Sequence, residues 1–170
     1  MKNIIILGST GSLGTQTLEV LKKYPNDFKI IGLSAHKNIE LLAKQAKPHS
    51  AQAATTPDEI LALATHPDAD IIINVISGLA GLAPTQAALK AGKTLLSGNK
   101  ESIIAGQITQ TVIPLDSEHN AIFEILKAHP EKTPAMITLP ASGGPFLHST
   151  DLSQVTPEQA IKHPKWKMGA

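Results

Sequence analysis

Cysteine is absent from this chain of 170 residues. Disulfides and thiolate metal sites are therefore excluded, and any metal ligand must be an oxygen or an imidazole nitrogen. A metal bound by such a chain is expected to be a hard cation, Mg²⁺ or Mn²⁺.

Blocks of like charge and long apolar runs are missing as well. Fifteen basic and fourteen acidic residues leave a formal net charge of +1, so we expect neither a nucleic-acid partner nor a membrane-surface helix. The apolar run at residues 4–7 is too short for a signal-peptide core, and the run at 71–76 is interrupted by Asn74. We therefore expect a cytoplasmic protein that does not associate with membranes and whose partners are small molecules.

Short apolar runs alternate with helical patterns over the first hundred residues. Strands are expected at 3–7, 28–34, 71–76 and 93–97, and helices at 12–23, 38–47, 56–64 and 84–90. This order is typical of an α/β fold with a doubly wound, Rossmann-like parallel sheet. Beyond residue 98 the pattern loosens into a helix at 100–110, a strand at 111–115, a helix at 121–127 and a strand at 135–139. We divide the chain into a nucleotide-binding domain at 1–110 and the first part of an α+β catalytic domain at 111–170.

A glycine-rich turn follows the first expected strand. Residues 8–14 read GSTGSLG and lie between that strand and an amphipathic helix, which is the setting in which such a turn cradles a pyrophosphate. A purely structural turn is the alternative. The second strand ends without the acidic residue that holds the ribose of NAD(H); Ser34, His36, Lys37 and Asn38 follow instead, which favours the 2′-phosphate of NADP(H). For each of these side chains a solvated helix start is an open alternative.

The residues 114–121, PLDSEHNA, are the strongest sign of a metal site. If this segment is extended, Asp116 and Glu118 project to the same side and can share one hard cation, while Ser117 faces its own partner. A solvated turn at a strand end is the competing interpretation.

Three further stretches could bind or cover a ligand, and the first offers Lys100 to an anionic or carbonyl-bearing substrate. Lys100 follows the strand at 93–97, although Asn-Lys-Glu-Ser is also an ordinary helix start. Ser142 precedes two glycines and could present a hydroxyl and bare amides to a phosphate. His163 lies near Trp166 in a tail that reads as a mobile lid or as a frayed terminus.

Five of these motifs occur in an order typical of one enzyme family: residues 8–14, 99–102, 116–123, 141–146 and 163–169. On these motifs the chain resembles 1-deoxy-D-xylulose 5-phosphate reductoisomerases along its whole length. That family rearranges the carbon skeleton of a phosphosugar and reduces the resulting aldehyde with NADPH, giving 2-C-methyl-D-erythritol 4-phosphate for isoprenoid synthesis.

The resemblance implies a role for each matching position. It implies NADPH contacts by nine residues: Thr10, Gly11, Ser12, Leu13, Lys37, Asn38, Asn99, Glu101 and Gly169. Asp116 and Glu118 would hold Mn²⁺ or Mg²⁺. Five residues would bind the substrate: Lys100, Ser117, Glu118, Ser142 and His163. Of these, Lys100, Glu118 and His163 are the expected catalytic residues, and the family precedent suggests a homodimer.

The chain also departs from the family pattern. Family members continue far beyond this length, and a third carboxylate ligand and further phosphate-binding groups belong to the portion not present here. Segments 47–57 and 102–112 look shorter than in the family. Because two carboxylates and water bind a divalent ion weakly, we expect the isolated chain to have little or no reductoisomerase activity. Another NADP-dependent aldehyde reductase and a non-catalytic NADPH-binding module are the alternatives.

Overall fold

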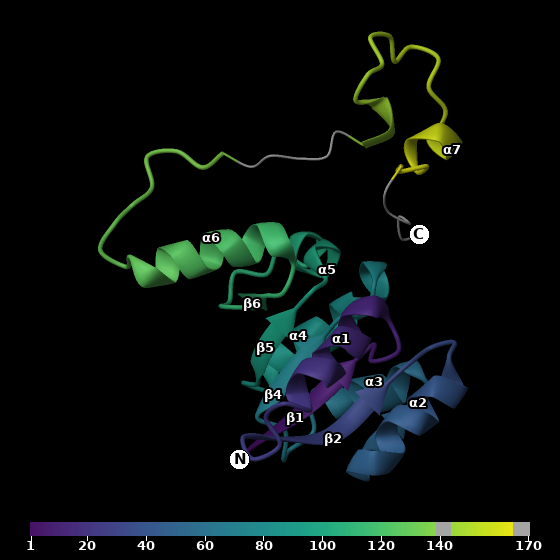
Figure 1. Cartoon of the computed structure of the whole chain (residues 1–170), viewed down its shortest axis with the longest axis vertical. Coiled ribbons are helices and arrows are strands. Elements are labelled where there is room, and N and C mark those ends of the chain that lie inside the picture. The colour runs from purple at the N-terminus through teal and green to yellow at the C-terminus, as the bar shows by residue number, and fades with distance from the viewer. Residues whose placement is uncertain (139–143, 165–170) are drawn as a thin grey trace. The chain divides into compact units, whose positions relative to one another are not determined.

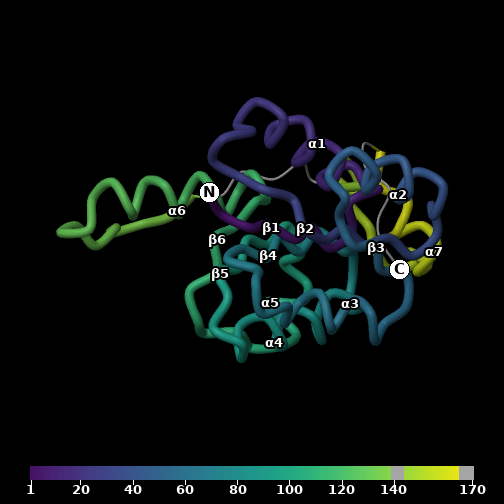
Figure 2. The backbone as a smooth tube through the Cα atoms, turned by 90° about the horizontal axis from the view of Figure 1, so that it is seen from below, coloured from purple at the N-terminus to yellow at the C-terminus, as the bar shows by residue number. Residues whose placement is uncertain are grey.

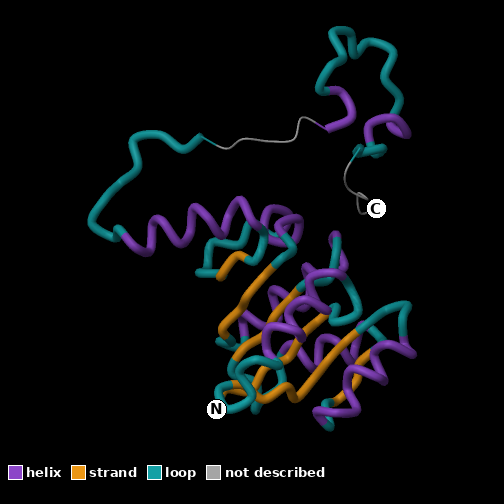
Figure 3. The backbone as a smooth tube through the Cα atoms, viewed as in Figure 1, coloured by secondary structure: helices purple, strands orange, loops and turns teal. Residues whose placement is uncertain are grey.

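The centre of the protein is a parallel β-sheet. The computed structural model describes residues 1–138 and 144–164, and six strands pair in the order β3-β2-β1-β4-β5-β6, every pair parallel (Figures 1 and 3). The strands are β1 (Lys2–Leu7), β2 (Phe28–Ser34), β3 (Gln52–Ala54), β4 (Ile71–Asn74), β5 (Thr94–Ser97) and β6 (Ile113–Pro114). The predicted doubly wound α/β fold is confirmed.

Helices cover both faces of this sheet (Figure 2). The helices of the first 128 residues are α1 (Ser12–Leu21), α2 (Ile39–Ala46), α3 (Pro57–Ala64), α4 (Leu82–Lys90), α5 (Lys100–Ala105) and α6 (Ser117–Ala128), with short 3₁₀ turns η1 (Lys47–His49) and η2 (Gly78–Gly81). The helices α1 and α2 lie on one face, and α3, α4 and α5 lie on the other. The chain therefore crosses the sheet plane after β3, as doubly wound folds do.

Two apolar cores result, one on each face. Ile4 and Ile6 of β1 pack with Leu18 of α1 and Leu42 of α2. The alternating residues of the same strand, Ile5 among them, pack on the opposite core with α3 and α4. Ile4, Ile5 and Ile6 are at most 2% exposed, because a central parallel strand is buried on both faces and therefore reads as an unbroken apolar run.

Several elements differ from the sequence expectation. Strand β3 was not predicted, yet it forms inside the segment 47–57 that looked shortened. The helix expected at 100–110 ends at Ala105, since Gly106 caps it and Gln107 adopts a positive φ of 48°. The strand expected at 135–139 is wrong over residues 135–138, which form no regular structure, and residue 139 lies outside the described residues.

The chain divides into two compact units, residues 1–127 and 128–170. In the second unit the described residues contain a 3₁₀ turn, η3 (Gly144–Phe146), and a short helix, α7 (Pro157–Ala160), which begins with a capping box between Thr156 and Gln159. The boundary between residues 110 and 111 expected from the sequence stays a prediction. Within 1–138 and 144–164, no helix has the length and apolar character needed to cross a membrane.

Candidate cofactor and metal site

The glycine-rich turn connects β1 to α1 in a conformation that requires glycine. Gly8 has φ +89°, and a Cβ built on it would lie 3.0 Å from the backbone nitrogen of Ile76. A Cβ on Gly14 would lie 2.4 Å from the carbonyl oxygen of Gly8. The turn is thus packed tightly between the start of α1 and the segment after β4, which is how glycines permit a close backbone approach.

The second strand and α2 hold this turn in place. The backbone N–H of Gly8 donates to the hydroxyl oxygen of Ser34 at 3.0 Å, and the N–H of Ser9 donates to the carbonyl oxygen of Ser34 at 2.9 Å. The hydroxyl of Ser9 donates to the side-chain oxygen of Gln45 at 2.8 Å, and the Gln45 amide donates to the Ser9 carbonyl oxygen at 3.1 Å. Ser9 is fully buried, so its hydroxyl serves the turn itself.

Four of the nine residues predicted to contact the cofactor follow this anchored part. Gly11, Ser12 and Leu13 are exposed, and Thr10 is half-buried. Gly11 is the N-cap of α1, and within the described residues no side chain caps that helix start. The first N–H groups of α1 are therefore available to an anion, and the helix dipole favours negative charge there.

Three loops meet at the carboxyl end of the sheet. Gly8, after β1, lies against the backbone of Val75 and Ile76, after β4. A Cβ on Gly98, after β5, would lie 2.7 Å from the Leu13 side chain and 3.3 Å from that of Val75. Ligands of open α/β folds bind at this end, near the point where the strand order reverses from β1 to β4.

Two buried amide side chains fix the loop between β4 and α4, residues 75–81. Asn74 donates to the carbonyl oxygen of Gly81 at 2.9 Å and to the hydroxyl of Thr85 at 2.8 Å, and it accepts from the N–H of Ile76 at 3.1 Å. Asn74 is fully buried. Sequence reasoning gave it no role, although an asparagine that interrupts a run of isoleucines is a signal of a buried polar contact.

Asn99 holds the same loop from the side of β5. Its side-chain amide donates to the carbonyl oxygens of Ile76 and Gly78, and its oxygen accepts from the N–H of Ser102 at 2.9 Å. Asn99 is only 2% exposed. Its side chain is therefore engaged within the protein, and its contact with NADPH stays a prediction. Lys100 and Glu101 begin α5 at the same end of the sheet and are exposed.

The positions after β2 also lie at this end. Asn38 is the N-cap of α2, because its side-chain oxygen accepts from the N–H of Leu41 at 3.1 Å. Lys37 and Asn38 are exposed. The hydroxyl of Ser34, in contrast, is committed to Gly8, which leaves Lys37, His36 and Asn38 as candidates for the 2′-phosphate.

The tract around Asp116 is not extended. Helix α6 begins at Ser117, and Asp116 caps it by accepting from the backbone N–H of His119 at 3.1 Å. The His119 ring nitrogen Nδ1 lies 2.8 Å from the same carboxylate oxygen. Asp116 and Glu118 were expected to project to the same side only if the segment is extended, and it is not. At a helix start, residues two positions apart do not face the same side. The tract begins with an ordinary N-cap aspartate.

Asp116 nevertheless lies at the carboxyl end of the sheet. The N–H of Leu115 donates to the carbonyl oxygen of Ser97 at 2.8 Å, which continues the pairing of β6 with β5, and Asn120 donates to the carbonyl oxygen of Pro114 at 2.9 Å. Asp116 is half-buried, and Ser117 and Glu118 are exposed. Carboxylate oxygens suit Mg²⁺ or Mn²⁺, but the described residues contain no group of three acidic or histidine side chains around one point. The donor set suits a hard cation and is incomplete.

The remaining predicted residues belong to the second unit. His163 is half-buried, and a Cβ on Gly144 would lie 3.9 Å from its ring. Ser142 and Gly169 lie outside the described residues. Whether these three residues join Lys100 and Glu118 stays a prediction.

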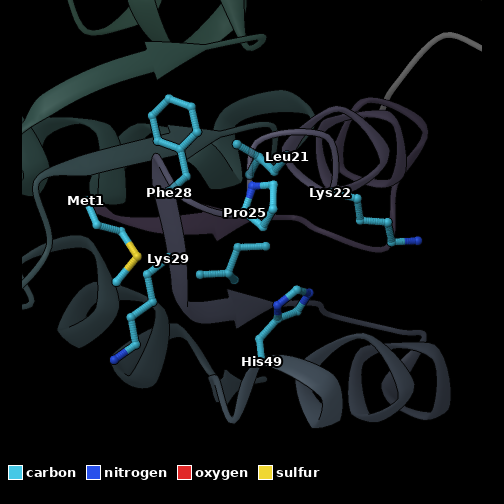
Figure 4. A pocket seen from close by; sticks show the side chains of 8 residues that line it. Met1, Leu21, Lys22, Pro25, Phe28, Lys29 and His49 are labelled. Atoms are coloured by element: carbon cyan, nitrogen blue, oxygen red, sulfur yellow. The ribbon is translucent and has the colours of Figure 1, made fainter.

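A hollow of about 190 Å³ lies at the opposite, amino end of β1 and β2 (Figure 4). Burial, and to a smaller extent the Lys22 ammonium group, lowers the pKa of His49 in its wall. The lining residues are Met1, Leu21, Lys22, Pro25, Phe28, Lys29, Ile30 and His49. None of them is a predicted cofactor or metal residue.

Two family models match almost the whole chain. The family model described as 1-deoxy-D-xylulose 5-phosphate reductoisomerase matches residues 4–60 and 50–107, and the model of the C-terminal domain of the same enzyme matches residues 112–170. The chain belongs to the 1-deoxy-D-xylulose 5-phosphate reductoisomerase family. The resemblance expected from the sequence motifs is confirmed.

Individual members of the reductoisomerase family are similar to this chain in sequence and in structure. The enzyme of Thermoanaerobacter pseudethanolicus is 39% identical over 201 residues, a match that covers 99% of this chain and 53% of the relative. The Zymomonas mobilis reductoisomerase in complex with NADPH is 31% identical with a TM-score of 0.77 and covers 94% of this chain and 51% of that chain. A reductoisomerase in complex with NADPH, fosmidomycin and magnesium is 26% identical with a TM-score of 0.72 and covers 99% of this chain and 52% of that chain.

The chain spans about half the length of the curated reductoisomerases that it matches. The match also extends over 201 residues although this chain has 170, so the relative is longer within the shared part too. The two stretches that match the family model overlap at residues 50–60. This overlap includes most of the first segment that looked shortened, residues 47–57. The positions of both shortened segments stay a prediction.

Proposed function

We propose that this chain binds NADPH and forms the cofactor-binding part of a metal-assisted enzyme that converts 1-deoxy-D-xylulose 5-phosphate to 2-C-methyl-D-erythritol 4-phosphate. The observation that carries the proposal is the meeting of the loops after β1, β4 and β5 at the carboxyl end of the sheet. Membership of the reductoisomerase family supports it, and so do the NADPH and magnesium named for the solved relatives.

Each end of the cofactor has its own group of residues in this proposal. Thr10, Gly11, Ser12 and Leu13 bind the pyrophosphate through the open start of α1. Lys37 and Asn38 bind the 2′-phosphate, for which an ammonium group and an amide are suitable donors. Asn99, Glu101 and Gly169 complete the set of proposed NADPH contacts.

The substrate and the metal lie beside this cofactor in the proposal. Asp116 and Glu118 hold Mn²⁺ or Mg²⁺, which when bound polarises the substrate carbonyl as a Lewis acid. Lys100, Ser117, Ser142 and His163 are the proposed phosphosugar-binding residues, as the family resemblance implies. The cofactor supplies the hydride.

Activity is proposed to require groups beyond this chain. Two carboxylates bind a divalent ion weakly, and the described residues contain no group of three acidic or histidine side chains that could hold a metal ion together. We therefore infer that the 170-residue chain alone has little or no turnover. Homodimer formation is inferred from the family resemblance, and light scattering of the purified chain tests it. The cytoplasmic location expected from the sequence is proposed as well.

Titration of the purified chain with NADPH and NADH tests cofactor binding directly. Fluorescence of the reduced nicotinamide should report binding of NADPH in preference to NADH, and Lys37→Ala should reduce that preference by about tenfold, the loss of one charge-assisted contact. Lys23→Ala, on an exposed lysine beyond α1, is the matched control. Equal affinity of the unaltered chain for the two dinucleotides would refute the role of Lys37.

A non-catalytic NADPH-binding module is the second candidate. It is favoured by the hydrogen bonds of Asp116, which already acts as the helix cap of α6. The two candidates differ in one experiment, in which the missing C-terminal half of a reductoisomerase is added as a separate polypeptide. Oxidation of NADPH that requires both the phosphosugar and Mn²⁺ supports the enzyme; NADPH binding without such turnover supports the module.

A further inference from the structure

The helix α2 is attached to the glycine-rich turn by one side chain that no cofactor prediction includes. Gln45, in the last turn of α2, exchanges two hydrogen bonds with Ser9: its oxygen accepts from the Ser9 hydroxyl at 2.8 Å, and its amide donates to the Ser9 carbonyl oxygen at 3.1 Å. Ser9 and Gln45 are 36 residues apart in sequence. This pair is a specific tertiary connection between two elements that both lead to the predicted cofactor.

Ser9 has little freedom to move. It is fully buried, and the backbone of α1 approaches it so closely that a Cβ on Gly14 would lie 2.5 Å from the Ser9 Cα. Gln45 therefore acts on a residue that is already confined by α1. Any shift of α2 relative to the turn has to break both hydrogen bonds with Ser9.

The other end of α2 carries the predicted 2′-phosphate residues. Asn38 caps the helix, and Lys37 immediately precedes it. Leu42 and Ala46, one helical turn apart, are 1% and 7% exposed and fix α2 to the core on this face of the sheet. Gln45 lies seven positions after Asn38, which corresponds to a rise of about 10 Å along a helix. The helix is thus a short rigid spacer between Lys37 and the turn.

We propose that Gln45 is a positioning residue that fixes the distance between the pyrophosphate site at residues 10–13 and the 2′-phosphate site at Lys37 and Asn38. This inference rests on the proposed binding of NADPH. A ligand with two anionic groups gains from the second site only when the two sites are held at the matching separation, because that separation sets the effective concentration of the second contact. NADPH has both groups and NADH lacks the 2′-phosphate, so Gln45 contributes to cofactor selectivity without touching the cofactor.

The variant Gln45→Leu tests this inference in the full chain by titration with NADPH and NADH. Loss of both hydrogen bonds is expected to raise the Kd for NADPH by about tenfold and the Kd for NADH by less than about threefold. The ratio of the two Kd values is the decisive quantity, because a change in fold stability alone alters neither Kd while the chain is folded. Gln86→Leu, which makes the same change at an exposed position of α4, is the control and should leave both values unchanged.

A milder variant covers the case in which Gln45→Leu does not fold. Ser9→Ala removes the hydroxyl from the pair and leaves the Gln45 amide its bond to the Ser9 carbonyl oxygen. It is expected to raise the Kd for NADPH about threefold and to lower the selectivity in the same direction.

Each outcome decides the matter. An unchanged Kd for NADPH, or an equal rise for both dinucleotides, overturns the spacing role of Gln45. If the unaltered chain does not bind NADPH, the proposed function itself fails and the inference fails with it. If the unaltered chain binds NADPH and the Gln45→Leu variant has the same Kd values, only the inference about Gln45 is refuted and the proposed function stands.

Discussion

The close approach of α1 to the glycine-rich turn leads to a sharp prediction for Gly14. A Cβ at this position would lie 2.4 Å from the carbonyl oxygen of Gly8, 2.5 Å from the Cα of Ser9 and 2.7 Å from its carbonyl carbon. All three atoms belong to the backbone and cannot rotate away. The variant Gly14→Ala therefore forces α1 to move by a large part of an ångström relative to the turn.

The expected cost exceeds the usual benefit of alanine in a helix. Replacing glycine by alanine in a helix interior ordinarily stabilises by about 1 kcal/mol. Inserting a methyl group into a packed site costs about 1–3 kcal/mol, and the upper end or more applies here because the obstacle is backbone. We expect Gly14→Ala to lower the free energy of unfolding by about 2 kcal/mol. Affinity for NADPH should fall as well, because the first N–H groups of α1 move with the helix.

Urea unfolding followed by circular dichroism measures this change. Gly11→Ala is the matched control in the same turn, since its Cβ would meet only the Gly8 carbonyl oxygen, at 3.4 Å, and its φ of −76° is allowed for alanine. We expect this control to change the free energy of unfolding by less than about 1 kcal/mol. If Gly14→Ala proves as stable as Gly11→Ala, the packing argument for the turn is wrong.

Three further predictions concern other parts of the fold. Asn74→Leu should destabilise the chain by about 3 kcal/mol in urea unfolding, because it leaves two buried polar groups, of Gly81 and Thr85, and the half-buried N–H of Ile76 without their Asn74 partner; a loss below about 1 kcal/mol would contradict the assigned hydrogen bonds. The backbone N–H of Thr55, first among several donors, lowers the pKa of Glu59, so the stabilisation by this carboxylate is present above the pKa of the unfolded chain and is lost as the pH falls through the lower folded value. Acid titration of Glu59→Gln should therefore show a weaker loss of stability on acidification, and identical acid profiles would exclude this effect. Asp116→Asn keeps a good helix cap and should lower the Mn²⁺ affinity about tenfold by electron paramagnetic resonance, whereas an unchanged affinity would leave Asp116 with the capping role alone.

The central sheet was predictable because its strands are short, mainly apolar segments. Burial on both faces favours such segments in β1, β2 and β4, and the sequence supplies them at 3–7, 28–34 and 71–76, although Lys29 and Asn74 interrupt the last two. The helix start at Asn38 was recognisable from its capping side chain, and the start at Thr56 from the proline and the acidic residues that follow it; both residues cap their helices in the structure. These signals depend only on neighbouring residues, so they can be recognised in a single sequence.

The misjudged elements lack such local signals or contain conflicting ones. Strand β3 consists of Gln52, Ala53 and Ala54, which have no apolar alternation, and it forms only because β2 offers a free side for pairing. The shared side of Asp116 and Glu118 was conditional on an extended tract; an aspartate before a helical pattern is also a start signal, and in the structure a helix begins there. The pair between Ser9 and Gln45 could not be foreseen, because its partners meet only when α2 has packed on the sheet.

The two outermost strands of the sheet are both short. β3 has three residues and β6 has two, one of which is Pro114 and has no N–H group to donate. A long edge strand with unpaired N–H and C=O groups is a template on which other chains can pair and aggregate. Short edge strands and a proline in an edge strand both reduce this pairing. Lateral sheet growth between copies is thereby disfavoured, and chains that do associate are expected to use helical surfaces.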